Sequence, residues 1–268
     1  MTRPRDLKPL RLNSKMAMND MPPEHVNTWL SLCLLPGTPE PRRCRDLGGR
    51  SGCQVWECEV GEERVVLKIY SSGCDDYSRL GPVDTARKHA LALRELPTFG
   101  VPTPRCLGLA VEGEEAALVT EWVEARPFTS AARAAAARVL ARLHAIEITD
   151  LSHELADLVS RSTPNRGRVG EAPGEPPLTD VTLQHGDYFS VNLLSTPDGI
   201  RVLDWDLLAL GDPMWDLGLL LCADRGLEEN EAAAVISAYG EIRQLSAGRL
   251  AWQRRCWEVF WRRREQRS

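Results

Sequence analysis

The hydrophobic pattern of the first half of the chain predicts a small antiparallel sheet. Apolar and polar residues alternate over 54–60 and again over 64–70, and a Gly-Glu-Glu turn separates the two runs. Alternation with a period of two is typical of strands that bury one face, so the runs predict a hairpin. Residues 106–111 and 116–123 predict two further strands. Between them and the hairpin, apolar residues at helical spacing predict one inserted helix that Asp84 caps.

Helical spacing dominates the rest of the chain. A stripe that includes Val26 and Trp29 predicts a helix before the sheet. An alanine-rich helix follows the sheet, and Thr129 or Ser130 is its expected cap. From Asp216 onward the apolar residues again recur at helical spacing.

These patterns predict an α+β protein with two parts. We expect residues 1–19 to be a disordered leader and residues 20–123 to form a lobe built on the sheet and its helix. Residues 124–268 should form a larger, mainly helical lobe. Several methionines close to Met1 leave the start of translation open, and the sequence leaves the oligomeric state open.

Composition is that of an ordinary globular protein, with 43% hydrophobic residues, 26% charged residues and a formal net charge of -5. A general nucleic-acid binder is usually basic, so we expect no nucleic-acid partner. The chain has no apolar run that could span a membrane and no apolar core of a secretory signal, which favours a cytoplasmic protein. The eight cysteines form no CxxC pair, so we expect free, buried thiols rather than disulfides.

The densest group of polar residues lies between apolar runs in the second half of the chain. His185, Asp187 and Asn192 fall within eight residues of one another, and Asp204 and Asp206 follow a short apolar run. Polar groups in such surroundings are costly unless they are paired or bind a ligand. The group therefore predicts a catalytic loop with a metal site beside it.

Phosphoryl transfer needs groups of these kinds. A triphosphate must be held, its charge must be neutralised by Mg²⁺, and an acceptor hydroxyl must lie beside a carboxylate. The chain holds candidates for all of these parts, in the order residues 48–52, Lys68, Asp187 with Asn192, and Asp204. We expect the side chains among them to meet between two lobes.

Three joined motifs carry a resemblance to a known family. They are His185-Gly186-Asp187 followed by Asn192, Leu203-Asp204-Trp205-Asp206, and Gly211-Asp212-Pro213 followed by Asp216. Together they resemble the aminoglycoside phosphotransferase family, a relative of the choline kinases. The resemblance implies a protein-kinase-like fold with two lobes. It also implies transfer of the γ-phosphate of ATP, with GTP left open, to a hydroxyl of a small molecule, above all an aminoglycoside or similar antibiotic.

The resemblance also implies roles for single residues. Asp187 would accept the proton of the acceptor hydroxyl. Asn192 and Asp204 would hold Mg²⁺, and Lys68 would contact the α- and β-phosphates of the nucleotide.

Two further segments would complete the nucleotide site by the same resemblance. The glycine-rich turn with Gly48, Gly49 and Ser51 would cover the phosphates. The backbone around Glu121 and Val123 would form the hinge that contacts the purine.

The chain departs from the family at one position. Members usually carry a glutamate on the helix of the first lobe, and that acid pairs with the strand lysine. The chain has Lys88 and His89 near this position and no acid. Asp84 and Glu95 are the candidates to pair with Lys68 instead.

Some polar residues of the motifs have structural explanations. We expect His185 to support the catalytic loop by hydrogen bonds rather than to act in proton transfer. Asp212 and Asp216 are expected to order that loop or to cap the next helix. With Asp206 they would otherwise form an acidic patch suited to a cationic substrate.

The same residues also allow alternative functions to be compared. A kinase of a small metabolite, such as choline or an amino-sugar, fits the motifs as well as an antibiotic kinase does. A nucleotide-binding protein without activity would also fit the missing acid, although it has no need of Asp187, Asn192 and Asp204 together. A metal-dependent glycosyltransferase leaves Lys68 unexplained, and the absence of a GxxxxGK motif excludes a P-loop enzyme.

Overall fold

The structure is a computed structural model, and it describes residues 22–49, 52–72, 79–164, 174–178, 180–222 and 227–265. The expected leader, residues 1–19, and Ser51 of the glycine-rich turn lie outside the described residues. The boundaries of the two lobes stay a prediction.

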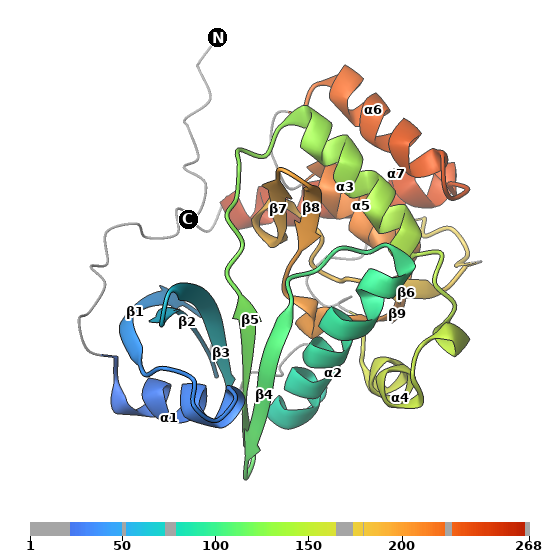
Figure 1. Ribbon diagram of the computed structural model, residues 1–268. Coiled ribbons are helices and arrows are strands. Elements are labelled where there is room, and N and C mark those ends of the chain that lie inside the picture. Colours follow the sequence, from blue (N-terminus) through green and yellow to red (C-terminus); the bar gives the residue numbers. More distant parts are fainter. Residues whose placement is uncertain are drawn as a thin grey trace.

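A five-stranded antiparallel sheet forms the first part of the molecule (Figure 1). Its strands are β1 (Pro41–Gly48), β2 (Cys53–Val60), β3 (Glu63–Tyr70), β4 (Cys106–Glu112) and β5 (Glu115–Glu121), in the order β1-β2-β3-β5-β4. The predicted hairpin is β2 with β3, and the two later strands are β4 and β5. Most of β1 lacks an apolar alternation because it is an edge strand with several exposed positions.

Alternate residues of the central strand β3 pack against opposite faces of the sheet. Leu67 belongs to a buried cluster with helix α1 (Glu24–Cys33). Tyr70 belongs to a second cluster with helix α2 (Pro82–Glu95) on the other face. Lys68 shares the face of Tyr70 because side chains alternate along a strand. The alternation thus directs the predicted phosphate-binding lysine away from α1 and toward α2.

The start of helix α2 differs from the prediction. The N-cap is Gly81, Pro82 is the first helical residue, and no side chain caps the helix. Proline fits the first turn because its missing N–H would have no helical partner there. The carboxylate of Asp84 instead accepts a hydrogen bond from Arg161 at 3.0 Å. The prediction that Asp84 caps this helix was therefore wrong.

The cysteines also differ in part from the prediction. Cys44 on β1 lies opposite Cys58 on β2, with 4.3 Å between their Cα atoms, and a disulfide joins them. The expectation of free thiols was wrong for this pair because the strand register makes the two residues direct neighbours. Disulfides are typical of oxidising compartments, so the cytoplasmic location stays a prediction. The free cysteines among the described residues are Cys33, Cys106, Cys222 and Cys256.

The second part of the molecule is mainly helical, as predicted (Figure 1). Its helices are α3 (Ser130–Leu143), α4 (His153–Arg161), α5 (Pro213–Cys222), α6 (Glu229–Gly240) and α7 (Ala247–Glu265). Thr129 caps α3, because its hydroxyl accepts a hydrogen bond from the backbone N–H of Ala132 at 3.2 Å. Helix α3 packs against α6, and α5 packs against α7. None of the described helices is long and apolar enough to cross a membrane.

Two small antiparallel sheets bring the polar motifs together. Strand β6 (Thr182–Gln184) pairs with β9 (Ala209–Gly211), and β7 (Leu193–Thr196) pairs with β8 (Gly199–Val202). The loop with Asp187 connects β6 to β7, and the segment with Asp204, Trp205 and Asp206 connects β8 to β9. Both connections therefore run between the same two sheets, so residues far apart in sequence become neighbours.

Candidate active site

The catalytic loop starts with a turn that only glycine adopts without strain. Gly186 has a φ of 85°, in the left-handed region. A Cβ at this position would lie 2.8 Å from the Cβ of Leu207 and 2.9 Å from its carbonyl oxygen. The carboxylate of Asp216 accepts hydrogen bonds from the backbone N–H groups of His185 at 2.7 Å and Gly186 at 2.9 Å. Asp216 thus orders the loop from the first turn of α5.

His185 supports the loop from within. The imidazole is buried, and its Nε2 lies 2.8 Å from the carbonyl oxygen of Leu203. Its Nδ1 accepts a hydrogen bond from the backbone N–H of Asp187 at 3.2 Å. A carbonyl cannot donate, so Nε2 is the nitrogen that donates and Nδ1 is the one that accepts. These two contacts connect the catalytic loop to the segment before Asp204.

Asp187 and Asn192 form one unit. The carboxamide nitrogen of Asn192 donates to the backbone oxygen of Asp187 at 2.9 Å and to its carboxylate at 3.2 Å. With the nitrogen engaged, the carboxamide oxygen is the atom that remains to bind a cation. Both side chains are buried to more than nine-tenths, which makes a charged carboxylate costly unless it is partnered.

Strand pairing places Asp204 beside Asn192. Leu193 of β7 lies opposite Val202 of β8, and the backbone N–H of Leu203 donates to the carbonyl of Asn192 at 2.9 Å. Asp204, the next residue, has a left-handed backbone with φ 60° and ψ 67°. Such a conformation is uncommon outside glycine and is concentrated at functional sites. Carboxamide and carboxylate oxygens are the ligands that Mg²⁺ prefers, so the two side chains fit a magnesium site.

Lys68 reaches this site from the sheet. Its ammonium group donates to the carboxylates of Asp204 at 2.6 Å and Asp206 at 2.5 Å. Burial by itself lowers the pKa of Lys68, but the two carboxylates outweigh it and hold that pKa above its ordinary value. The lysine is therefore charged throughout the physiological range, as a phosphate ligand must be.

Neither of the acids expected to pair with Lys68 does so. Asp84 binds Arg161. The carboxylate of Glu95 accepts hydrogen bonds from the backbone N–H of Ser152 at 2.9 Å and from its hydroxyl at 2.6 Å. Both predictions were wrong because the helix directs these side chains toward α4 and away from the sheet lysine.

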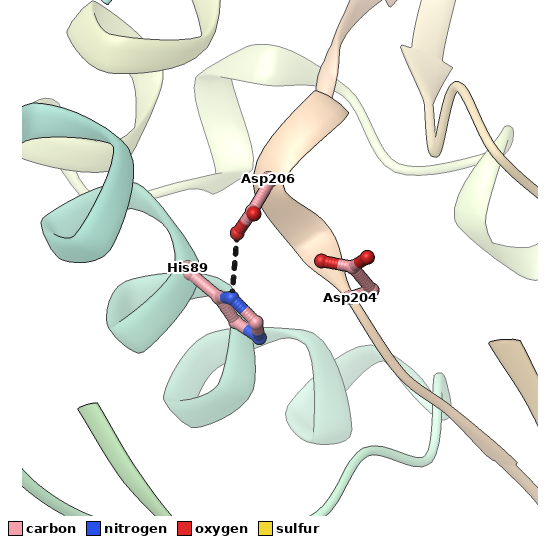
Figure 2. Close-up of side chains that lie close together, drawn as sticks. All are labelled: His89, Asp204 and Asp206. Carbon is pink, nitrogen blue, oxygen red and sulfur yellow. Dashed lines mark hydrogen bonds and ion pairs between the residues drawn. The ribbon is translucent and has the colours of Figure 1, made fainter. Parts of the chain in front are cut away.

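Asp206 has partners that the sequence did not reveal. Its Oδ1 lies 2.9 Å from Nδ1 of His89, which extends from α2 (Figure 2). The same oxygen accepts a hydrogen bond from the hydroxyl of Tyr70 at 3.0 Å. Burial raises the pKa of Asp206, but Lys68 and His89 outweigh it and hold that pKa far below its ordinary value. Donor atoms of His89, Asp204 and Asp206 all lie within 4.8 Å of one another. A histidine near the position that lacks the family acid was the one sequence signal for this cluster.

The glycine-rich turn follows β1. Gly48 has a φ of 85°, and its N–H donates to the carboxylate of Asp46 at 2.7 Å. A Cβ on Gly49 would lie 1.9 Å from the carbonyl oxygen of Cys53, so no other residue fits there without a shift of the backbone. The two backbone segments of the turn thus approach each other closely. Its contact with phosphates stays a prediction, and Ser51 lies outside the described residues.

The expected hinge follows the last strand of the sheet. The carboxylate of Glu121 accepts hydrogen bonds from the backbone N–H of Arg105 at 3.0 Å and from its guanidinium at 2.5 Å. The N–H of Trp122 donates to the carbonyl of Arg64 at 3.1 Å. These bonds leave the carbonyl of Glu121 and the N–H of Val123 as the groups for a purine, and that contact stays a prediction.

The acids after Asp206 bind protein groups. Asp212 accepts hydrogen bonds from Arg249 and from Gln253, both at 2.6 Å. Asp216 is fully buried and engaged by the catalytic loop. Asp212 and Asp216 are therefore structural acids and offer no free charge to a cationic substrate.

Comparisons with known proteins agree with this geometry. The model of the phosphotransferase enzyme family matches residues 154–255. No curated protein matches the chain. An aminoglycoside-3′-phosphotransferase of type VIII is 21% identical, with 81% of this chain and 93% of that chain covered and a TM-score of 0.55.

Two other solved structures are similar at lower identity. A spectinomycin phosphotransferase in complex with ADP and spectinomycin is 12% identical, over 90% of this chain and 86% of that chain, with a TM-score of 0.65. A choline kinase from Streptococcus pneumoniae is 17% identical, over 85% and 87% of the chains, with a TM-score of 0.58. The shared fold is the protein-kinase-like fold that the motifs predicted. The family match and the fold together confirm the resemblance to the aminoglycoside phosphotransferase family.

Proposed function

We propose that the protein is an ATP-dependent kinase that transfers the γ-phosphate to a hydroxyl of a small molecule. One observation carries the proposal. Lys68 and Asp204 form an ion pair at 2.6 Å, and strand pairing places Asp204 beside the bonded pair Asp187 and Asn192. These four residues come from three separate segments, and phosphoryl transfer uses each of them.

Asp187 is the proposed base. Its carboxylate accepts the proton of the acceptor hydroxyl while the hydroxyl oxygen forms a bond to the γ-phosphorus. The bond from that phosphorus to the β–γ bridging oxygen breaks, and ADP leaves with the electron pair. Asn192 holds the Asp187 carboxylate by the hydrogen bond at 3.2 Å, which orients it toward the acceptor.

Asn192 and Asp204 are the proposed magnesium ligands. Mg²⁺, when bound with the nucleotide, supplies neutralisation of the phosphate charge that develops during transfer. Lys68 contributes a second fixed positive charge on the phosphates. Both charges act in a partly buried site, where electrostatic interactions are stronger than in water.

The acceptor is proposed to be an aminoglycoside or a similar antibiotic, so the protein would confer resistance. The similar structures include kinases named for spectinomycin and for aminoglycosides, which supports this choice. The acidic residues Asp212 and Asp216 cannot contribute to binding a polycation, because protein groups engage them.

A specific observation favours a second acceptor class. Phe189, two residues after Asp187, packs against the same buried cluster of Trp215, Leu219 and Trp257 as the partly exposed rings of Phe260 and Trp261 on α7. Aromatic faces bind quaternary ammonium groups by cation–π interactions. A choline-like metabolite is therefore the second candidate, and a choline kinase is among the similar structures.

Turnover tests the proposed reaction. Purified protein with Mg²⁺ and ATP, or GTP, is incubated with aminoglycosides, spectinomycin, a macrolide, choline and amino-sugars, and the release of ADP, or of GDP, is measured. We expect acceptor-dependent release of the nucleoside diphosphate with at least one of them. Asp187→Ala should lower kcat by at least about 100-fold, since the base is lost. Asp198→Ala, in the exposed turn between β7 and β8, is the matched control and should leave kcat unchanged.

The result also decides the alternative of an inactive nucleotide-binding protein. Normal nucleotide binding without turnover on any acceptor would favour that alternative. An Asp187→Ala variant with nearly normal kcat would refute the assignment of the base.

A further inference from the structure

We propose that Asp206, held by His89 and Tyr70, replaces the missing helix acid as the residue that orients Lys68 toward the nucleotide phosphates. The inference rests on the proposed function, because Lys68 must have phosphates to contact. It assigns Asp206, His89 and Tyr70 as positioning residues that act through the lysine.

The two carboxylates that share Lys68 are not equivalent. The side chain of Asp204 is 36% exposed, whereas that of Asp206 is 19% exposed. Asp204 lies beside Asn192 and is the proposed magnesium ligand. A cation at Asp204 would compete with the lysine for the same carboxylate oxygens. Asp206 would then remain as the carboxylate partner of Lys68 when nucleotide and metal are bound.

Both oxygens of Asp206 already have defined protein partners. Oδ2 accepts from Lys68 at 2.5 Å. Oδ1 accepts from Tyr70 at 3.0 Å and lies 2.9 Å from Nδ1 of His89. The Tyr70 hydroxyl also lies 2.8 Å from Nδ1 of His89, so the hydroxyl, Nδ1 and Oδ1 are all within hydrogen-bond distance of one another. Oδ1 can accept from both the hydroxyl and the His89 Nδ1–H, because a carboxylate oxygen has two lone pairs. The carboxylate is thus fixed in rotation, and Oδ2 is directed to the lysine.

Helix α2 is also anchored to the segment that carries Asp206. Lys88, next to His89, donates to the carbonyl of Leu208 at 2.8 Å and to the hydroxyl of Ser162 at 2.7 Å. Consecutive helix residues therefore bond to residues only two positions apart in the other segment. These two contacts together fix the position of His89 along the axis of α2 relative to Asp206.

Charge complementarity favours a histidine over an acid at position 89. A glutamate at position 89 would place a second anion against Asp206, and the two would repel. Histidine can donate a hydrogen bond to that carboxylate instead. The anion that orients the lysine has in effect moved from α2 to the end of the segment after β8, and a donor has taken its former place.

The same cluster is less suited to a second metal ion. His89, Asp204 and Asp206 offer three ligand atoms within 4.8 Å (Figure 2). However, the ammonium group of Lys68 lies between the two carboxylates at hydrogen-bond distance from both. Both oxygens of Asp206 are engaged as well, so a metal would have to displace several partners.

Moving the carboxylate from position 206 to position 89 tests the proposal. Asp206→Asn removes the charge and keeps the shape, and it should lower kcat about 100-fold, the effect of a misplaced reacting group, with the acceptor KM within about threefold of wild type. His89→Glu should also lower kcat, because two acids then face each other. The double variant His89→Glu/Asp206→Asn restores one carboxylate, on the helix, and should recover at least about tenfold of the lost kcat. His153→Gln, exposed at the start of α4, is the matched control.

Nucleotide affinity, magnesium dependence and melting temperature are measured for every variant. We expect nucleotide dissociation constants within about fivefold of wild type and an unchanged Mg²⁺ concentration for half-maximal rate. Unchanged kcat in Asp206→Asn would overturn the proposal. So would a double variant with a wild-type melting temperature and no recovery, or an Asp206→Asn variant whose defect is repaired by excess Mg²⁺. Wild-type protein that binds no nucleotide would instead refute the proposed function, so the two failures are distinguishable.

Discussion

Gly186 is a single residue whose lack of a side chain determines the shape of the loop that carries Asp187. Its left-handed φ of 85° and its contact with Leu207 both require glycine. The turn directs the N–H groups of His185 and Gly186 to Asp216, so the position of Asp187 depends on it. A residue without reactive side-chain atoms thereby sets where the carboxylate of the proposed base lies.

Gly186→Ala should therefore damage both stability and catalysis. A Cβ only 2.8 Å from that of Leu207 forces a shift of the loop, and we expect a loss of about 1–3 kcal/mol in the free energy of unfolding. The value of kcat should fall by at least about tenfold as Asp187 moves. Gly113→Ala is the matched control, because Gly113 has a φ of 60° but nothing within 4 Å of its Cβ position. Equal kcat in the two variants would contradict this account; urea titration and steady-state kinetics measure both effects.

Helix α2 is the element that joins the sheet to the catalytic segments. Its Lys88 is fully buried, and the partners of its ammonium group among the described residues are neutral oxygens of Ser162 and Leu208. Burial lowers the pKa of Lys88 to about 7, although Asp206 opposes the shift. The attachment of the helix is therefore sensitive to pH.

The stability of the protein should rise with pH above about 7 because of this lysine. Its ordinary pKa is 10.5 and its folded pKa is about 7, so between these values the unfolded chain binds more protons than the folded one. Linkage then predicts a contribution of up to about 1.4 kcal/mol per pH unit, which is absent below the folded pKa. In Lys88→Met the free energy of unfolding should lack this rise between pH 7.0 and about 8.5. In Arg87→Met, a change on the exposed side of α2, the rise should persist.

Urea unfolding at the two pH values measures the difference. The buried tyrosines and Cys33 have raised pKa values and also contribute to the pH dependence, but they are the same in wild type and in Lys88→Met, so the difference between the two slopes belongs to Lys88. The same pH slope in wild type and Lys88→Met would show that the lysine is not the cause.

One buried cluster extends from the sheet into the helical part of the molecule. It includes Tyr70 and Leu118 of the sheet, Leu96 at the end of α2, and Leu140 and Leu183 of the helical part. Two lobes with separate cores would unfold independently, whereas a shared core couples them. The coupling suits the site, because Lys68 from the sheet must keep its place against Asp204.

The two parts should therefore unfold in a single transition. Leu118→Ala, at a fully buried position of β5, should destabilise the molecule by about 2–5 kcal/mol. Hydrogen exchange in peptides from β3 and from α5 should then accelerate together under native conditions. Acceleration confined to the sheet would indicate that the lobes unfold separately.

The sequence by itself determined the local elements and the joined motifs. Hydrophobic period and turn residues depend on neighbours in the chain, so the hairpin, the helical second part and the Thr129 cap could all be predicted. The spacing of Asp187, Asn192 and Asp204 carried the family resemblance for the same reason. These features arise from contacts over short distances in sequence.

Only the tertiary structure decided which groups meet across long distances. Lys68 and Asp206 are 138 residues apart, and His89 and Asp206 are 117 apart, so no local pattern links them. Their contact depends on the strand alternation of β3, the anchoring of α2 through Lys88, and the pairing of β7 with β8. The partner of Lys68 could therefore not be predicted from the spacing of residues in the sequence. A carboxylate on any segment that folds next to the ammonium group can pair with it.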